Sequence, residues 1–187
     1  MSKRVIAIVG MPGSGKTVVT KYLQDKHGWP NVYMGEPTFD RIKEEGLETN
    51  YENEKICREK IRAEMGMGAY ATLCLPKIKD KLQSSNVCLV ESMYSWSEYK
   101  IYKEKFGDDF YCLAVFANPE IRFKRLSDRH NERPMSSREE FDRRDYTEIE
   151  GIEKGGPIAR ADFMAINETS LEDLKIQIDK FINKILK

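Results

Sequence analysis

Net charge, histidine, paired cysteines and long apolar runs are all scarce in this sequence. The 187 residues carry 31 Lys and Arg against 31 Asp and Glu, so no overall field favours nucleic acid or an anionic membrane. The four cysteines show no C-x-x-C spacing and the two histidines stand alone, so no zinc site is predicted. Apolar runs such as residues 5–9 and 113–117 are too short to span a bilayer or form a signal peptide. These absences favour small-molecule chemistry in a cytoplasmic protein, with neither nucleic acid nor membrane as a partner.

The length and composition suit one globular domain covering residues 1–187. Hydrophobic residues make up 40% of the chain and charged residues 33%, which is typical of a soluble folded protein rather than a disordered one. Domains commonly hold ~100–200 residues, so a second independent core is not expected. Cys88 and Cys112 fall inside predicted strands, where a reduced thiol behaves as a small apolar group, so we expect buried, unpaired cysteines.

What the sequence does contain, close to its start, is a phosphate-binding pattern. The apolar run 5–9 is followed by GMPGSGKT at 10–17, which matches G-x-x-x-x-G-K-S/T. The glycines let successive backbone N–H groups turn toward one anion, Lys16 adds a positive charge for the β and γ phosphates of ATP, and the Thr17 hydroxyl can take one position around Mg²⁺. A predicted helix after the loop points its positive end at the same phosphates. The predicted nucleotide-binding residues here are Gly10, Met11, Pro12, Gly13, Ser14, Gly15, Lys16, Thr17 and Val18.

Strands and helices alternate along the rest of the chain. Further strands are predicted at 31–34, 86–91, 110–116 and 162–166. This order predicts an α/β fold with about five parallel strands and helices on both faces. The third strand ends at Glu91, and ligands bind at the carboxyl ends of parallel strands, so we expect Glu91 to hold Mg²⁺ together with Thr17. The final helix is predicted to begin after Ser170 and to bury an apolar stripe of Leu171, Leu174, Ile178, Phe181, Ile182 and Ile185.

The region between the second and third strands, residues 35–85, is charged and helical. We predict two or three helices, interrupted at Gly46, at 66–68 and at Pro76. Thr38 is expected to cap the first of them, and Thr49 or Asn50 the second. Many small kinases hold the phosphate acceptor in such an insertion, although a charged helical run can equally be a solvated surface.

Arginine is concentrated late in the chain. One predicted helix begins at Asn118 and Pro119, and another is predicted to begin with a capping box of Ser137 and Glu140 and to end at 155–157. The planar fork of arginine grips phosphate with two hydrogen bonds, so we expect residues 129–145 to form a lid that closes over the reacting groups. Alternatively, nearby Asp and Glu residues pair with these arginines at the surface. The arginines concerned are Arg122, Arg125, Arg129, Arg133, Arg138, Arg143 and Arg144.

Four stretches of the sequence, GMPGSGKT, RFKRLSDR, EEFDRRDYTE and ARADFMAINETSLEDL, resemble the nucleoside-monophosphate-kinase branch of P-loop kinases. Within that branch the chain is most similar to dephospho-coenzyme A kinase-like and adenylate-kinase-related proteins, and the resemblance covers nearly the whole chain. It implies a three-layer P-loop kinase fold with a helical acceptor-binding insertion and an arginine-rich lid. It also implies that Arg129 or Arg133 and Arg143 or Arg144 are catalytic, and that the segment around Asn167 passes by the adenine.

The chain also departs from this family at two strand ends. Relatives usually carry Asp-Gly after the third strand, where this chain has Glu91 and Ser92. After the second strand they carry an arginine near the position of Phe39, and Arg41 or Arg62 is the candidate replacement.

The sequence therefore predicts a kinase that moves the γ-phosphate of ATP, with Mg²⁺, to a small nucleotide or nucleotide-like acceptor. A nucleoside monophosphate or dephospho-coenzyme A is the expected type of acceptor. The alternative is a P-loop NTPase or a nucleotide-binding regulatory module that has no small-molecule acceptor. Phosphorylation of a nucleic acid end is disfavoured by the zero net charge. The donor base and the oligomeric state are left open by the sequence.

Overall fold

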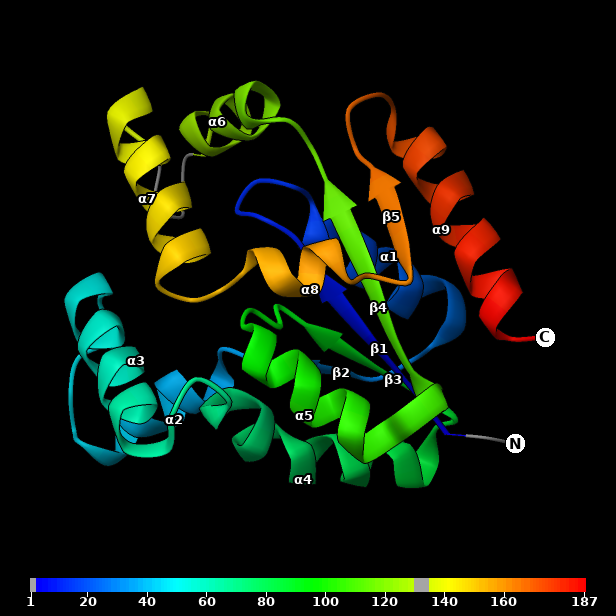
Figure 1. Cartoon of the computed structure of the whole chain (residues 1–187), viewed down its shortest axis with the longest axis horizontal. Coiled ribbons are helices and arrows are strands. Elements are labelled where there is room, and N and C mark those ends of the chain that lie inside the picture. The colour runs from blue at the N-terminus through cyan, green and yellow to red at the C-terminus, as the bar shows by residue number, and fades with distance from the viewer. Residues whose placement is uncertain (1–2, 130–134) are drawn as a thin grey trace.

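Five parallel strands form one sheet at the centre of the molecule (Figure 1), in the order β2-β3-β1-β4-β5. The structure is a computed structural model that describes residues 3–129 and 135–187. The strands are β1 Arg4–Val9, β2 Asn31–Tyr33, β3 Val87–Glu91, β4 Phe110–Phe116 and β5 Phe163–Ile166. The predicted five-stranded parallel sheet is thus confirmed.

Helices follow each strand and cover both faces of the sheet. They are α1 Lys16–His27, α2 Glu36–Glu44, α3 Tyr51–Met65, α4 Ala69–Ser84, α5 Trp96–Phe106, α6 Pro119–Ser127, α7 Arg138–Glu150, α8 Gly155–Ala159 and α9 Leu171–Ile185, with a short 3₁₀ helix η1 Gly107–Asp109. Polar side chains start several of them as predicted. The Asn118 side chain accepts a hydrogen bond from the N–H of Ile121, and Ser170 and Asp173 form a capping box.

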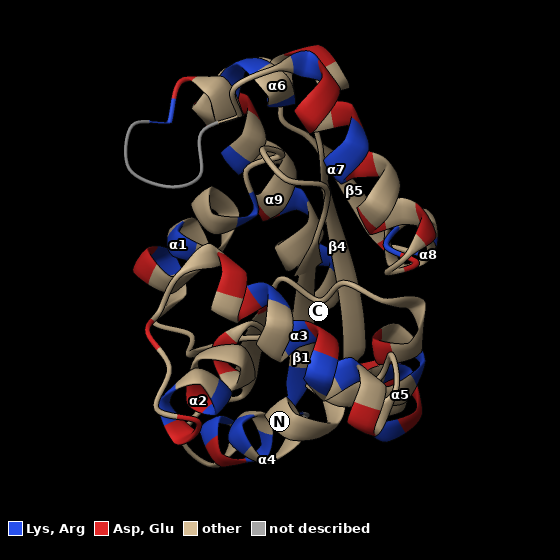
Figure 2. Ribbon diagram, turned by 90° about the vertical axis from the view of Figure 1, so that its left-hand side faces the viewer, with Lys and Arg blue, Asp and Glu red and all other residues tan. Residues whose placement is uncertain are grey.

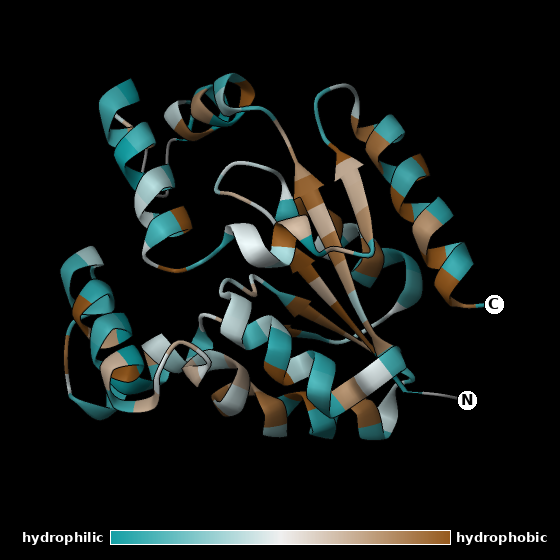
Figure 3. Ribbon diagram, in the orientation of Figure 1, coloured by the Kyte–Doolittle hydropathy of each residue, from teal (hydrophilic) through white to brown (hydrophobic). Residues whose placement is uncertain are grey.

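The core has two layers because successive residues of a strand point to opposite faces of the sheet. Ile6 and Ile8 of β1 pack against α1 and α9, whereas Val5 and Ala7 pack against α4 and α5. All of these β1 side chains are fully buried, and the strands form the most hydrophobic part of the ribbon in Figure 3. All four cysteines are free and buried, which confirms the expectation for Cys88 and Cys112. In the part of the chain that the structure describes, no helix is long and apolar enough to cross a membrane.

The helical region 35–85 forms three helices, α2 to α4, but two of its predicted boundaries are wrong. Thr38 does not cap α2; it lies within the helix, where its buried hydroxyl meets that of Tyr70 at 2.7 Å. Pro76 does not interrupt α4, because the buried residues Cys74 and Ile78 on either side of it anchor the helix to the sheet. Of the two caps considered for α3, Asn50 is the one used, and it accepts from the N–H of Asn53 at 2.9 Å.

Other predicted details in the second half of the chain also need correction. Helix α7 ends at Glu150, and the glycines at 155 and 156 begin a separate short helix, α8, with Pro157 in its first turn. Ser137 caps α7, but the Glu140 carboxylate reaches the N–H of Ser136, so the reciprocal half of the predicted capping box is missing. Leu171 is 52% exposed, since it occupies the first position of α9, outside the buried stripe.

Helix α5 is an element that the sequence analysis did not assign. Its first turn carries a complete capping box, in which Ser95 accepts from the N–H of Glu98 and Glu98 accepts from the N–H of Ser95. The S-x-x-E spacing that makes this box was visible in the sequence. Tyr99 and Tyr102 follow on the buried face of the helix. That spacing, followed by buried aromatics, would have predicted the helix.

Helices α2 and α3 of the insertion and the arginine-rich helices α6 and α7 all lie near the edge of the sheet where the strands end. In Figure 1, α6 and α7 lie above the carboxyl ends of the strands and α2 and α3 lie below them. The loop between β1 and α1 emerges between these two groups. The candidate site is therefore built where three parts of the chain converge.

Candidate active site

The loop between β1 and α1 is a cradle of backbone groups. Gly10 and Gly15 have φ angles of 148° and 104°, which strongly favour glycine, and Gly15 is the residue directly before α1. A Cβ atom on Gly15 would lie 2.2 Å from the side-chain nitrogen of Asn167, so the position also has no room for a side chain. The buried hydroxyl of Ser14 has no hydrogen-bond partner. A cradle of this shape with an unsatisfied polar atom fits a bound phosphate.

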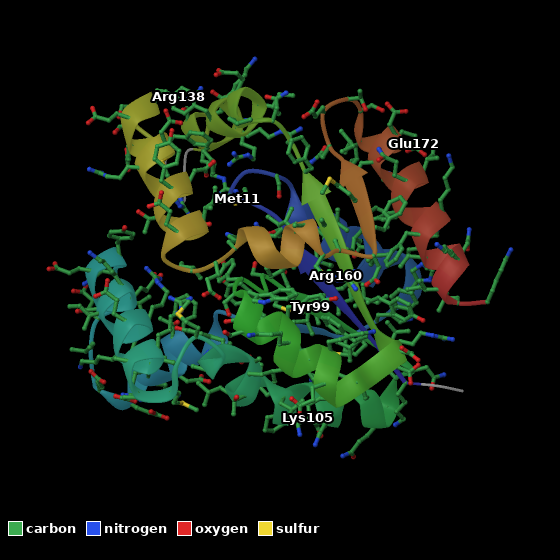
Figure 4. All side chains as sticks on the ribbon, viewed as in Figure 1. Met11, Tyr99, Lys105, Arg138, Arg160 and Glu172 are labelled. Carbon is green, nitrogen blue, oxygen red and sulfur yellow. The ribbon has the colours of Figure 1, made fainter. Side chains whose placement is uncertain are left out.

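Lys16 folds back onto the loop. Its Nζ donates to the carbonyl oxygens of Gly10 at 2.9 Å and Met11 at 3.2 Å. Burial, followed by repulsion from Lys154, lowers the pKa of Lys16 to about 7. Figure 4 shows the labelled Met11 in this loop, between α7 and the end of β4. A phosphate arriving in the cradle would restore the full charge of Lys16, because a nearby anion favours the protonated form.

Thr17 and Glu91 are brought together as the sequence predicted. Ile8 of β1 lies opposite Glu91 of β3, so both strands end at the same edge, and the Thr17 hydroxyl donates to Glu91 Oε1 at 2.7 Å. The other carboxylate oxygen accepts from the Asn31 side chain at 3.3 Å. A hydroxyl and a carboxylate beside a phosphate cradle fit Mg²⁺, which prefers oxygen ligands and keeps several waters. Since no cluster of three His, Cys, Asp or Glu residues exists among the described residues, phosphate oxygens and water would complete the shell.

Asn167 also lies at the loop. Its side-chain nitrogen donates to the Ser14 carbonyl at 2.8 Å, and its own carbonyl accepts from Arg125 Nη2 at 2.9 Å. Arg125 Nη1 further donates to the Gly13 carbonyl at 3.4 Å. Asn167 and Arg125 thus stabilise the loop through its Ser14 and Gly13 carbonyl groups. The predicted contact of Asn167 with adenine remains a prediction.

Arg122, at the start of α6, joins the loop to α7. It is 4% exposed and forms two hydrogen bonds with the Asp145 carboxylate, while Nη1 also donates to the Pro12 carbonyl at 3.3 Å. Its Nε donates to the Ala117 carbonyl at 3.0 Å, and its guanidinium lies 4.9 Å from the centre of the Phe141 ring. Arg122 therefore holds the structure together and does not face a substrate.

The predicted catalytic arginines occupy different surroundings. Arg144 is half-buried and donates from Nε to Glu148 at 3.3 Å, within the electrostatic reach of Lys16. Arg129 and Arg143 are exposed, and Arg133 lies outside the described residues. Arg138 forms exposed ion pairs with Glu120 and Asp142, part of the mixed charge along α6 and α7 in Figure 2. Of the three predicted arginines that the structure describes, it therefore brings Arg144 within electrostatic reach of Lys16.

Helix α7 packs against α6 through apolar side chains. Phe141 is fully buried, and with Leu126 and Met135 it forms a small hydrophobic cluster of its own between α6 and α7. The role of 129–145 as a lid stays a prediction.

Sequence reasoning missed three residues of the site. Lys154, just before α8, is 2% exposed; its Nζ forms an ion pair with Glu148 and lies 4.2 Å from the centre of the Tyr94 ring. Burial lowers the pKa of Lys154, and Glu148 opposes that shift. No spacing pattern marks Lys154, Glu148 or Tyr94, because they meet only through the packing of α7 and α8 against the segment after β3.

On the acceptor side, the two candidate arginines differ in their availability. Arg41 is held by Glu64 at 2.6 Å and 3.1 Å, and it also contacts Glu45. Arg62 lies 5.1 Å from the centre of the Tyr70 ring, and its buried Nε has no hydrogen-bond partner. Glu98, fully buried, has an unpartnered Oε1, and burial raises its pKa to about 7. Arg62 and Glu98 thus both have hydrogen-bonding capacity left for a ligand.

Comparison with other proteins agrees with this geometry. A family model described as an AAA domain matches residues 6–149 of the chain. A "UPF0200 protein" from Thermococcus onnurineus is 33% identical over 184 residues, covering 97% of this chain and 98% of that protein. The crystal structure of TT1252 from Thermus thermophilus superposes with a TM-score of 0.65 at 21% identity over 100% of both chains. A shikimate kinase from Bacteroides thetaiotaomicron does so with a TM-score of 0.61 at 14% identity, covering 98% of this chain and 99% of that one. The shared architecture is the three-layer P-loop kinase fold.

Proposed function

The chain belongs to the AAA domain family, a P-loop family of kinase-like fold, and from that premise we propose that it is an ATP-dependent phosphotransferase. It moves the γ-phosphate of ATP to a small nucleotide or nucleotide-like acceptor, of the nucleoside monophosphate or dephospho-coenzyme A type. Thr17 and Glu91 hold Mg²⁺, which neutralises phosphate charge when it is bound.

One observation carries this proposal: cations from α7 and from the turn before α8 are held by Glu148 within electrostatic reach of the P-loop lysine. Simple nucleotide binding needs the loop and Lys16, whereas phosphoryl transfer also needs positive charge around the group that moves. Arg144 and Lys154 both lie close enough to Lys16 to influence its pKa. They belong to α7 and the turn before α8 and not to the loop, so they add positive charge to that of the loop and Lys16.

The acceptor side favours an anionic molecule. Arg62 offers a free N–H, and its flat guanidinium is already placed over Tyr70. An arginine with donors to spare binds phosphate or carboxylate in two-pronged fashion. The unpartnered oxygen of Glu98 can accept a hydrogen bond from a hydroxyl or amino group of the same molecule. An acceptor with both features fits the nucleotide-like class.

The proposal is tested by the release of ADP from ATP with and without candidate acceptors. The panel contains nucleoside monophosphates, nucleosides and dephospho-coenzyme A, and the phosphorylated product is identified by mass spectrometry. We expect one acceptor class to raise ADP release at least ~10-fold over water, with stoichiometric product. Arg62→Lys should raise KM for that acceptor more than it alters binding of ATP, because a point charge cannot reproduce the arginine fork. Arg41→Lys, on the already engaged arginine, is the matched control.

The rival function, an NTPase or nucleotide-dependent binding module, is favoured by one observation. Arg41 is the arginine nearest in sequence to Phe39, the position near which relatives carry an arginine. Its guanidinium already forms an ion pair with Glu64. A panel that yields slow ADP release, unchanged by any acceptor, would support that rival. ATP binding that depends on Lys16 would then remain as the activity.

A further inference from the structure

Two cations, Arg144 and Lys154, contact one carboxylate, Glu148, within electrostatic reach of the loop. Glu148 accepts from Arg144 Nε at 3.3 Å and pairs with Lys154 Nζ, and it is one of the charges that sustain the protonation of Lys16. Lys154 is 2% exposed, and its pair with Glu148 takes both groups out of water. Buried pairs of this kind rarely stabilise a fold more than apolar residues of the same size would. The position of this pair near a phosphate cradle points to a role in binding.

Backbone strain lies on both sides of this cluster. Among the described residues, Ser92 and Glu153 are the non-glycine residues with positive φ, at 68° and 56°. Ser92 begins the turn that presents Tyr94, and Glu153 directly precedes Lys154. Such conformations are unfavourable for residues with a side chain and persist only where the surroundings fix them. Here they place an aromatic face and an ammonium group against each other, 4.2 Å from ring centre to nitrogen.

The distance between this cluster and the loop is also fixed. Asp145 of α7 is bound to Arg122, and Arg122 donates to the Pro12 carbonyl of the loop. Glu148 lies three residues further along the same helix, one turn away on the same side. The carboxylate is therefore held next to the phosphate cradle by a buried connection.

We propose that Lys154 contacts the phosphoryl group that is transferred. Until nucleotide binds, the Glu148 carboxylate occupies the place of that phosphoryl group beside Lys154. The inference rests on the proposed phosphotransfer function. A phosphoryl group offers the same partners what Glu148 offers, namely negative charge and several acceptor oxygens. During transfer the bond from the γ-phosphorus to the β–γ bridging oxygen breaks, a bond to the acceptor oxygen forms, and the acceptor proton leaves to water. Lys154 exchanges no proton and supplies charge and hydrogen bonds.

The experiment compares the binding of ADP with that of ADP plus aluminium fluoride, which mimics the moving phosphoryl group, by titration calorimetry with Mg²⁺ present. In Lys154→Met we expect the affinity for ADP alone to stay within about twofold of the parent. The gain in affinity that aluminium fluoride gives should be ~10- to 100-fold smaller, as for loss of one charge-assisted hydrogen bond. Lys154→Arg should retain much of the gain. Glu148→Gln should increase it, because the competing carboxylate is neutralised.

Lys26→Met is the matched control. Lys26 also pairs with a carboxylate, Asp179 at 2.7 Å, and lies 5.3 Å from the centre of the Tyr22 ring, but on the outer surface. We expect it to behave as the parent in both titrations. Melting curves report separately whether each variant folds.

A purely structural role for Lys154 predicts a different pattern. If Lys154 only neutralises Glu148, the double variant Lys154→Met, Glu148→Gln should recover the gain from aluminium fluoride, whereas our inference requires the gain to stay lost in a folded double variant. The double variant also serves if Lys154→Met alone does not fold. A parent that fails to bind ADP, or binds it without any gain from aluminium fluoride, overturns the phosphotransfer proposal itself and this inference with it. A normal gain in Lys154→Met overturns the inference alone.

Discussion

The substitution Asp145→Asn tests whether α7 is attached to the phosphate loop through Arg122. In the parent, Asp145 Oδ1 accepts from Arg122 Nη1 at 3.0 Å and Oδ2 accepts from Nη2. An asparagine can accept one of these bonds but places an N–H₂ group against the other donor. The guanidinium, 4% exposed, would then carry its charge without a counter-ion.

The loss of stability in Asp145→Asn depends on which contacts Arg122 retains. Removing one partner of a buried ion pair costs ~3–5 kcal/mol. Arg122 retains its hydrogen bonds to the Ala117 and Pro12 carbonyls and its contact with the Phe141 ring, so we expect the low end, about 3 kcal/mol. For a chain of this length each kcal/mol shifts Tm by roughly 2–4 °C, so the midpoint should fall by about 6–12 °C.

Scanning calorimetry and urea denaturation measure this change, and the same helix supplies the control. Asp142→Asn removes an ion pair between Asp142 and Arg138 whose side chains are 38% and 42% exposed. Solvent screens that pair, so its loss should have only a small effect on Tm. Equal shifts for the two variants would refute the buried connection. The double variant Arg122→Met, Asp145→Leu should recover most of the stability while weakening ADP binding, because the Pro12 carbonyl loses its donor.

Three further predictions concern the loop and the strand end beside it. Lys16→Ala should fold normally and lose turnover by a factor of hundreds or more, equivalent to ~3–4 kcal/mol of transition-state stabilisation; an unchanged rate in a folded variant would contradict the role of the loop. Glu91→Gln should raise the Mg²⁺ concentration needed for half-maximal activity more than it weakens nucleotide binding, and superimposable Mg²⁺ activation curves would make Glu91 a structural residue. ADP binding at pH 8.5 should take up about one proton, because Lys16, with its pKa lowered to about 7, is mostly neutral in the free protein and protonated beside phosphate. The uptake should vanish below pH 6 and in Lys16→Met, and calorimetry in buffers of different ionisation enthalpy measures it.

The half of the site that binds the donor could be predicted from the sequence because it is local. The cradle, Lys16 and Thr17 lie within eight consecutive residues, and the pattern itself specifies their backbone. Glu91 required one further step, the rule that parallel strands end at the same edge of a sheet, and the Thr17 hydrogen bond at 2.7 Å agrees with it.

The other half depends on how helices pack, which no local pattern specifies. Arg122, Arg125 and Arg129 recur at helical spacing, so the sequence grouped all three on one face, whereas α6 ends at Ser127 and carries only Arg122 and Arg125 of the three. In the fold that face meets the phosphate loop, and the partner of Arg122 is Asp145, 23 residues away. The pair of Lys154 and Glu148 arises in the same way, from the turn that returns α7 to the sheet. The sequence thus assigned one role to all of these arginines, whereas in the structure they have different partners and positions.

The positive charges of the site differ in whether they are already bound to the phosphate loop. Arg122 and Arg125 donate to Pro12, Gly13 and Asn167, so their charge stabilises the cradle and is already committed before a nucleotide arrives. An electrostatic contribution to catalysis requires donors that are held in place before the reaction and aimed at the charge that develops. Arg144 and Lys154 are both oriented by Glu148. Under the proposed function, the site would therefore have one set of cations that shapes the loop and another set for the phosphoryl group.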